Sequence, residues 1–356
     1  MVNPKLLAAA FVQRQRYPVT KRAVYSCDIA KAMASSSTAT ADEADDKRFF
    51  AMEKRNWEQG FEAYDEGFGP LTRQTIPTLL SDVRISSSNF IDDDCHHYKL
   101  LDVATGPGFV LSAAIDAAMT LDVPKESYRN FQFTGLDITE NFLQMAKQRI
   151  DAQLQNEDIM RNKQIQFNVD FVKGSAESLP FDDESFDKIV CNFGILHFFH
   201  PHTFLRESYR VLRPGGSVSF SAWAPPDRTE GFRIALESIA EVGNPNVEGI
   251  PDGPNFFDFG DSKQATNVLN EIGFVDTKSI ELSEMKWTSV HNGSDLYNVL
   301  LQGTSRTREI LLGQTKEETA AIRSLMSEKY DEITTSNERH LAMPAVVTSG
   351  CKPVST

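Results

Sequence analysis

The chain has 356 residues, of which 40% are hydrophobic and 24% charged, and its formal net charge is −14. These values are typical of a globular protein, and no stretch approaches the roughly 20 uninterrupted apolar residues that a membrane-spanning helix needs. The negative charge disfavours binding to nucleic acid phosphates, so the expected partner is a small molecule.

Residues 1–41 differ in composition from the rest of the chain. They hold six basic residues against one acid, Asp28, and end in ASSSTAT. This composition is typical of an organelle transit peptide, with the mitochondrion expected first and the plastid second. A disordered tail on a cytoplasmic protein is the alternative.

Residues 42–97 are expected to form a helical cap followed by a linker. Aromatic residues recur near helical spacing between 42 and 82, and GFGP at 67–70 interrupts the pattern. A polar segment, RISSSNFIDDD, then leads into the next region.

Residues 98–223 alternate short apolar runs with amphipathic segments, which predicts a parallel sheet covered by helices. Strands are predicted at 99–104, 132–137, 167–172, 187–192 and 216–222. Helices are predicted to start near Gly108, Thr139 and Pro201, and a further short helix is considered after Ser175. RPGG at 213–216 predicts a turn that begins the fifth strand.

Residues 224–356 are expected to complete the same domain. Pro, Gly and Asn are frequent in 224–260 around one short helix, which is typical of a lid or substrate loop. A helix ending at Gly273, an extended segment over 275–290, helices at about 294–332 and a last strand in LAMPAVVTSG are predicted to follow.

Candidate binding residues gather where predicted strands end, the edge at which open parallel sheets bind ligands. Gly106 and Gly108 would let a ligand approach the main chain, and Asp102 just before them could bind an ammonium group. Asp137 ends the second strand, and its two oxygens could accept both hydroxyls of a ribose.

The third and fourth strand ends add further candidates. Ala176 and Glu177 could contact an adenine edge, and Asn192 ends the fourth strand. The pattern G-x-G-x-x-G of nicotinamide-binding domains fails, because Leu111 stands at the third glycine position.

In chain order, LLDVATGPG, TGLDIT, VKGSAESLPFDDESFDKIVCNFGILHF and SYRVLRPGGSV resemble the motifs of class I S-adenosylmethionine-dependent methyltransferases. The resemblance covers roughly 98–223 and is strongest to the small-molecule branch that includes the ubiquinone and menaquinone biosynthesis C-methyltransferases. It implies an α/β fold, with a doubly wound, mostly parallel seven-stranded Rossmann-like sheet, a helical N-terminal cap and inserted helices near the C-terminus. It also implies S-adenosylmethionine as cofactor.

The resemblance also implies roles for individual residues. Those implied to bind the cofactor are Asp102, Ala104, Gly106 and Gly108 at the methionine part, Asp137 and Ile138 at the ribose, Ala176 and Glu177 at the adenine, and Asn192 through its backbone near the ammonium group. Ala104, Thr105 and Pro107 stand where the family often has Gly, Cys and Thr. We expect this departure to be tolerated.

Methyl transfer from a sulfonium is an in-line displacement that needs aligned reactants and exclusion of water. His197, in LHFFHPH, is the candidate base or substrate hydrogen-bond partner, although a structural role at the strand–helix junction is equally open. Tyr64, beside DEGFGP, is expected to point into the site as a second catalytic candidate. No metal site is expected, because the three nearby histidines have no carboxylate or cysteine at fixed spacing.

Trp223, Phe256 and Phe257 are the candidate substrate-binding residues, whereas Trp57 and Phe61 are expected mainly to pack in the core. The expected acceptor is a small organic molecule: a quinone precursor, a secondary metabolite or a thioether acid. An RNA or protein methyltransferase and a non-catalytic S-adenosylmethionine-binding module are the alternatives. The motifs define neither the methylated atom nor the oligomeric state.

Overall fold

The computed structural model describes residues 41–85, 97–123, 127–334 and 340–354. The predicted transit peptide, apart from Ala41, and most of the predicted polar linker lie outside these residues. No helix within the described ranges is long and apolar enough to cross a membrane.

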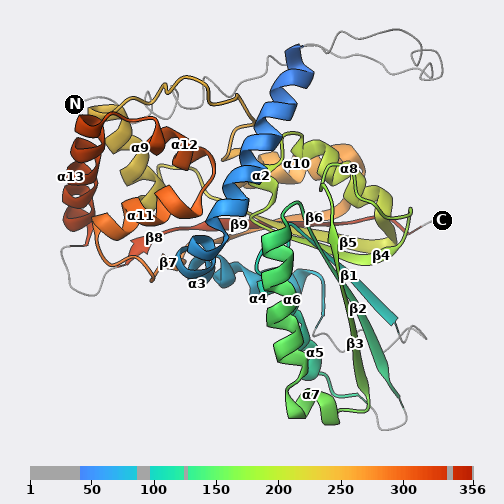
Figure 1. The fold of residues 1–356 in the computed structure, drawn as a ribbon. Coiled ribbons are helices and arrows are strands. Elements are labelled where there is room, and N and C mark those ends of the chain that lie inside the picture. Colours follow the sequence, from blue (N-terminus) through green and yellow to red (C-terminus); the bar gives the residue numbers. More distant parts are fainter. Residues whose placement is uncertain (1–40, 86–96, 124–126, 335–339, 355–356) are drawn as a thin grey trace.

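A seven-stranded sheet forms the centre of the molecule (Figure 1). Its strands are β1 (His97–Val103), β2 (Arg129–Asp137), β3 (Ile165–Lys173), β4 (Phe186–Asn192), β5 (Leu212–Trp223), β6 (Val275–Leu282) and β9 (Ala345–Cys351). They lie in the order β3-β2-β1-β4-β5-β9-β6, and β9 pairs antiparallel with both of its neighbours. This arrangement confirms the predicted α/β fold class.

Two apolar cores cover the two faces of the sheet. One contains side chains of α4 (Ile76–Asp82), α5 (Phe109–Met119) and α6 (Glu140–Leu154), and the other contains side chains of α8 (Pro201–Val211) and α10 (Ser262–Ile272). β5 is continuously buried from Gly216 to Trp223, as expected of a strand covered on both faces.

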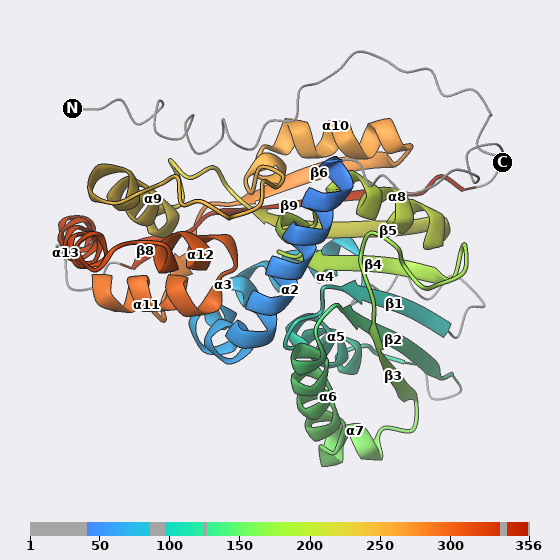
Figure 2. The ribbon, with the colours of Figure 1, turned by 45° about the horizontal axis from the view of Figure 1, so that its top comes forward.

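α2 (Ala41–Gly67) runs across the end of the sheet where β1, β2 and β4 finish (Figure 2). α3 (Gly69–Thr72) and the short turn η1 (Arg73–Thr75) connect it to α4. On the far side of α2 lies a group of four helices, α9 (Glu230–Val242), α11 (Gly293–Gly303), α12 (Arg306–Leu312) and α13 (Lys316–Ile333). The remaining described elements are α7 (Glu157–Arg161), η3 (Ile195–His197), η4 (Asp258–Gly260), β7 (Lys286–Trp287) and β8 (Leu341–Ala342).

Two local predictions were wrong. No helix follows Ser175; instead Ser175 bridges to Ser178, and its hydroxyl accepts a hydrogen bond from Glu177 N at 3.2 Å, which closes a turn. The predicted turn at 213–216 lies inside β5 as a bulge, because Phe186 pairs with Leu212 and Lys188 with Ser217. Gly215, at φ +79°, supplies the left-handed residue that this bulge needs.

Candidate active site

One cavity lies at the carboxyl ends of β1, β2, β4 and β5, with residues of α2, α9 and α12 along its other walls. It contains all but one of the residues assigned to the site from the sequence. Those lining it are Tyr64, Asp102, Ala104, Gly106, Asp137, Ile138, Ala176, Glu177, Asn192, His197, Trp223, Phe256 and Phe257. The structure therefore brings these residues together, and their individual roles stay predictions.

Gly108 is the exception, because it does not line the cavity. It precedes the first residue of α5 with a left-handed φ of +79°, and a Cβ atom there would lie 2.9 Å from the Ala146 Cβ atom of α6. Its lack of a side chain therefore serves the turn and the close approach of α5 to α6, and its predicted contact with the cofactor stays a prediction.

Asp137, at the end of β2, accepts three hydrogen bonds. Its Oδ1 atom accepts from Thr139 N and Thr139 Oγ1, both at 2.9 Å, and its Oδ2 atom accepts from Gly106 N at 3.0 Å. Burial raises the pKa of Asp137 despite these donors. The carboxylate thus ties the glycine loop to the start of α6 and lines the cavity wall.

Asp102 is more buried than Asp137, at 1% exposure, and only one of its two carboxylate oxygens has a hydrogen-bond partner among the described residues. Its Oδ2 atom accepts from Thr105 Oγ1 at 2.7 Å, whereas Oδ1 has no hydrogen-bond partner among the described residues. Burial, with a smaller contribution from the nearby charge of Asp137, raises the pKa of Asp102 to about 7. A buried carboxylate oxygen without a donor fits a ligand that brings an ammonium or hydroxyl group.

The side chain of Asn192 fixes the strand ends beneath the cap. Its Oδ1 atom accepts from Thr75 Oγ1 at 2.6 Å and from Ser221 Oγ at 2.7 Å, and its Nδ2 atom donates to Thr72 O at 3.1 Å. The predicted contact of Asn192 with a ligand uses its backbone and stays a prediction. Phe193, next in the chain, is held at φ +58°.

Glu177 also forms a hydrogen bond within the protein. Its Oε1 atom accepts from Phe199 N at 2.8 Å, which joins the loop after β3 to the segment before α8. Ala176 is buried beside it at 4% exposure. The two residues form one end wall of the cavity.

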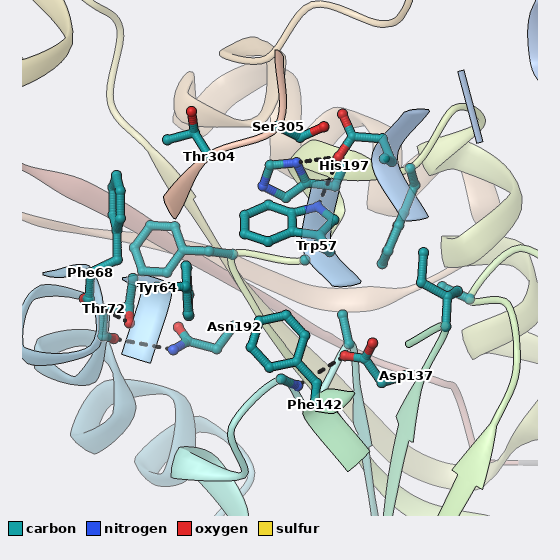
Figure 3. A pocket seen from close by; sticks show the side chains of 18 of the residues that line it. Trp57, Tyr64, Phe68, Thr72, Asp137, Phe142, Asn192, His197, Thr304 and Ser305 are labelled. Atoms are coloured by element: carbon teal, nitrogen blue, oxygen red, sulfur yellow. Dashed lines mark hydrogen bonds and ion pairs between the residues drawn. The ribbon is translucent and has the colours of Figure 1, made fainter. Parts of the chain in front are cut away.

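Glu53 of α2 is a site residue that the sequence reasoning missed. It is 2% exposed, and its Oε2 atom accepts from Trp57 Nε1 at 2.9 Å and lies 3.1 Å from His197 Nδ1 (Figure 3). Its Oε1 atom lies 3.9 Å from Arg306 Nε. Burial alone would raise the pKa of Glu53, but His197 and Arg306 outweigh that effect, and the pKa is lowered.

Trp57 lines the cavity in addition to packing, and its ring meets His197 edge-on at 4.8 Å. Tyr64 stacks on Phe68 at 5.8 Å and meets Trp57 edge-on at 5.5 Å. Removal from water raises the pKa of Tyr64 to about 12, so its hydroxyl stays protonated. The Tyr64 hydroxyl can therefore donate a hydrogen bond but is not a base.

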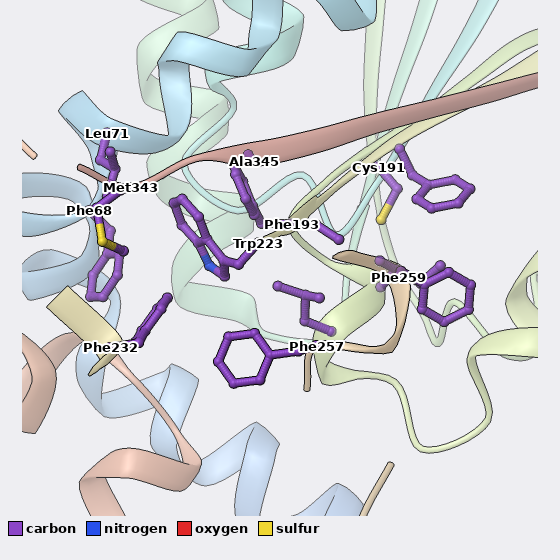
Figure 4. Packing of buried hydrophobic residues seen from close by; sticks show 14 of the residues in the cluster. Phe68, Leu71, Cys191, Phe193, Trp223, Phe232, Phe257, Phe259, Met343 and Ala345 are labelled. Carbon is purple, nitrogen blue, oxygen red and sulfur yellow. The ribbon is translucent and has the colours of Figure 1, made fainter. Parts of the chain in front are cut away.

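The predicted aromatic wall forms part of the core as well as the cavity (Figure 4). Trp223 stacks on Phe193 at 4.0 Å and is 3% exposed, and Phe257 is 8% exposed. Phe232, which was not predicted, meets Trp223 at 5.7 Å and Phe256 at 5.7 Å and also lines the cavity. These rings therefore form a wall of the cavity and pack in the core at the same time.

The other histidines of LHFFHPH lie apart from this cavity. His200 pairs with Asp46 at 3.0 Å, and burial lowers the pKa of His202. Within the described part of the chain, no group of three or more His, Cys, Asp or Glu residues could hold a metal ion.

Residues 101–220 match the family model described as a methyltransferase domain. The chain is 34% identical over 211 residues to the ubiquinone/menaquinone biosynthesis C-methyltransferase UbiE of Rhodopseudomonas palustris strain HaA2, which covers 55% of this chain and 73% of that protein. It is also 34% identical over 169 residues to UbiE of strain TIE-1, which covers 46% of this chain and 59% of that protein. It thus spans less than two thirds of the latter relative.

Among solved structures, one similar chain is Haemonchus contortus phosphoethanolamine N-methyltransferase 2 in complex with S-adenosyl-L-methionine. The identity is 16% and the TM-score 0.45, with 86% of this chain and 60% of that chain covered.

Proposed function

This chain belongs to the family of S-adenosylmethionine-dependent methyltransferases that includes the ubiquinone/menaquinone biosynthesis C-methyltransferases, and from this we propose that it transfers a methyl group to a small organic acceptor. When bound, S-adenosylmethionine supplies an electrophilic methyl group on a positively charged sulfur. The protein's own residues would hold that cofactor, orient the acceptor and exclude water.

The unpartnered Oδ1 atom of Asp102 is the observation that carries this proposal. An ammonium group on that atom would satisfy the buried carboxylate and favour its charged form. Asp137 and the loop at Gly106 lie beside it, so hydroxyl groups on an adjoining ribose would have an acceptor. A buried acid that can bind a cation, next to a second acid that can accept hydroxyl groups, fits a nucleoside that carries a free amino acid group, as S-adenosylmethionine does.

The other half of the cavity favours a planar, largely apolar acceptor. Trp57, Tyr64 and Phe256 present ring edges and faces there, and such rings also attract a neighbouring cationic sulfonium. The relatives' names refer to quinone biosynthesis, so a quinone precursor or a similar aromatic compound is the acceptor class we favour.

Calorimetry with S-adenosylhomocysteine and S-adenosylmethionine tests the proposal. We expect wild-type protein to bind both, and Asp137→Asn to weaken binding by about tenfold or more, because hydrogen bonds to a charged group contribute about 1.5–3 kcal/mol each. Asp170→Asn, at an exposed position on β3, is the matched control and should bind as the wild type does. Failure of the folded wild-type protein to bind either nucleoside would overturn the proposal.

A further inference from the structure

We propose that Glu53 and His197 form a general-base pair, in which the Glu53 carboxylate positions the imidazole and His197 Nε2 takes the proton of an acceptor hydroxyl. The inference rests on the proposed methyl transfer and narrows its acceptor to a compound with a phenolic or enolic hydroxyl. His197 is the catalytic residue in this account, and Glu53 is a positioning residue.

The pair is assembled by the fold from segments that lie 144 residues apart. Glu53 comes from the α2 cap, and His197 ends the short η3 turn after β4. The Glu53 side chain is 2% exposed and the His197 side chain 22%, so the imidazole borders the open cavity while the carboxylate lies behind it. Such a layered arrangement is typical of a base and the group that orients it.

The charge on Glu53 determines which imidazole nitrogen is available. Its Oε2 atom accepts from Trp57 Nε1 at 2.9 Å and its Oε1 atom lies 3.9 Å from Arg306 Nε, and both neighbours favour the charged carboxylate, which has no proton to donate. When the imidazole carries a single proton, that proton therefore lies on Nδ1, which faces Glu53, and Nε2 keeps its lone pair. No described residue forms a hydrogen bond with Nε2, which lies on the ring's side toward Thr304 and Tyr64 (Figure 3).

Neighbouring groups hold the imidazole in this orientation. Trp57 donates to the same Glu53 oxygen at 2.9 Å, and the rings of Trp57 and Phe256 meet the imidazole edge-on at 4.8 and 5.6 Å. These contacts leave the ring little freedom to rotate. They also place two aromatic rings beside the imidazole, and a planar acceptor could pack against them.

Charged groups surround the pair on several elements. Arg306 of α12 lies 3.9 Å from the free oxygen of Glu53, and its guanidinium donates to Pro254 O at 2.6 Å and to Leu196 O at 2.8 Å. Asp258 of η4 interacts electrostatically with Arg306, and Glu177 holds Phe199 N, two residues beyond His197. Arg306 thus offsets the buried charge of Glu53, so that the imidazole need not be protonated to do so.

The proton balance of the reaction explains why a base is needed. His197 Nε2 takes the hydroxyl proton as an electron pair of that oxygen bonds the methyl carbon, and the pair of the methyl–sulfur bond stays on the sulfur. If a conjugated ring carbon bonds the methyl group instead, that carbon later loses its proton and the hydroxyl is restored. Either route releases one proton overall, whereas a thioether acceptor releases none.

The first test measures which ring nitrogen of His197 carries a proton in the protein without any ligand. Nitrogen NMR of His197, assigned by its loss in His197→Gln, should show Nδ1 protonated and Nε2 bare at mildly alkaline pH. In Glu53→Gln the Nδ1 proton signal should move upfield, because the hydrogen bond loses its charged acceptor. Asp46→Asn, which changes the exposed His200–Asp46 pair joining the same segments, is the matched control and should leave the His197 signals in place. A proton on Nε2, or a spectrum that Glu53→Gln leaves unchanged, overturns the proposal.

The second test measures methylation of catechol, 1,4-hydroquinone, 1-naphthol, 4-nitrocatechol and the thioether thioanisole. Glu53→Gln and His197→Gln should lower kcat by about 100- to 10,000-fold with little change in KM or in S-adenosylhomocysteine affinity. The deficit should be smallest for 4-nitrocatechol, whose hydroxyl ionises most readily, and should shrink as the pH rises. Asp46→Asn should keep wild-type rates.

The outcomes separate this inference from the function on which it rests. An equal loss of rate with every acceptor, or methylation of thioanisole but of no hydroxyl compound, overturns the base pair. Binding of S-adenosylhomocysteine without turnover of any hydroxyl acceptor overturns the acceptor class. Absence of nucleoside binding by the wild type refutes the proposed function itself, and the NMR result then stands as a separate observation.

Discussion

Asp102 is buried at the floor of the cavity with one carboxylate oxygen unpaired, and this position costs free energy of folding. Burial raises the pKa of Asp102 from its ordinary value of 3.8 to about 7. The folded protein therefore holds this proton more tightly than the unfolded chain does. The cost is absent well below the unfolded pKa of about 3.9, grows as the pH rises and is complete above about pH 7.

Asp102→Asn should accordingly stabilise the unliganded protein at alkaline pH. At about pH 8 the gain in free energy of unfolding has an upper limit of about 4 kcal/mol, and it should shrink toward about pH 5, where most of the wild-type carboxyl is protonated in the folded state. Thr105 Oγ1 can still donate to the amide oxygen. Thermal unfolding at the two pH values measures the effect.

The same variant should bind S-adenosylmethionine more weakly than the wild type does, because the amide cannot offer a charge to the ammonium group. Asp170→Asn, at an exposed position, should change neither quantity. Equal melting temperatures for Asp102→Asn and the wild type at alkaline pH would show that the buried carboxylate imposes no cost.

Some site residues could be predicted from the sequence. Others could not, because their role depends on contacts between distant parts of the chain. Asp102 and Asp137 stand next to recognisable strand ends, and the carboxyl ends of parallel strands meet at one edge. Glu53 lies in an acidic helix where nothing local separates it from its neighbours, and Arg306 has no motif around it. Their importance comes from contacts across the fold, although the i, i+4 spacing of Glu53 and Trp57 is a local signal that could have been examined.

At the scale of single elements, the contact between α5 and α6 depends on Gly108. Gly108→Ala should destabilise the protein by about 2–4 kcal/mol, because it adds the strain of a left-handed alanine to a Cβ contact of 2.9 Å with Ala146. Gly249→Ala is the matched control, since Gly249 has φ +87° but nothing within 4 Å of its Cβ position. It should cost only the strain, about 1–2 kcal/mol.

Urea unfolding of both variants measures the difference, which isolates the packing part of the cost. Indistinguishable midpoints would mean that α6 moves away from α5 without penalty. Because Gly108 does not line the cavity, any loss of cofactor affinity in Gly108→Ala should come from displacement of the loop.

Helices and strands were predictable where the local sequence pattern is clear. They were uncertain where the structure depends on how one strand pairs with another. The five core strands lie within a few residues of their predicted bounds, because each is an apolar run or, in β3, an alternation of apolar and polar residues, between polar or glycine-containing turns. The segment at 213–216 was misjudged, since only its register against β4 makes Gly215 part of a bulge rather than a turn. Strand register is a long-range property that a local pattern does not contain.

At the scale of the whole molecule, α2 is a strap that closes the site, and several contacts fasten it. Trp287 Nε1 donates to Gly67 O at 2.9 Å near its end, and Asn141 Nδ2 of α6 donates to Glu58 O at 2.9 Å near its middle. This strap carries Glu53, Trp57 and Tyr64 to strand ends that are far away in the chain. The part of the cavity wall that these three residues form therefore depends on the strap being seated.

Arg149 of α6 contacts both the strap and the glycine loop and so links them. It pairs with Asp65 of α2 at 2.8 Å, donates to Pro107 O and lies over the Phe109 ring at 4.4 Å. Both members of the ion pair are about one quarter exposed, so the pair should be worth more than a surface pair, about 1–2 kcal/mol.

Arg149→Met keeps much of the packing on Phe109 and removes these polar contacts. We expect faster hydrogen exchange in the second half of α2 and weaker S-adenosylhomocysteine binding, because seating the strap must then be driven by the ligand. Lys147→Met on the same helix removes an exposed ion pair with Asp151 and should change neither readout. If the two variants show the same hydrogen exchange in α2 and the same S-adenosylhomocysteine affinity, the Asp65–Arg149 ion pair does not hold the strap. The strap must then be held by its apolar face alone.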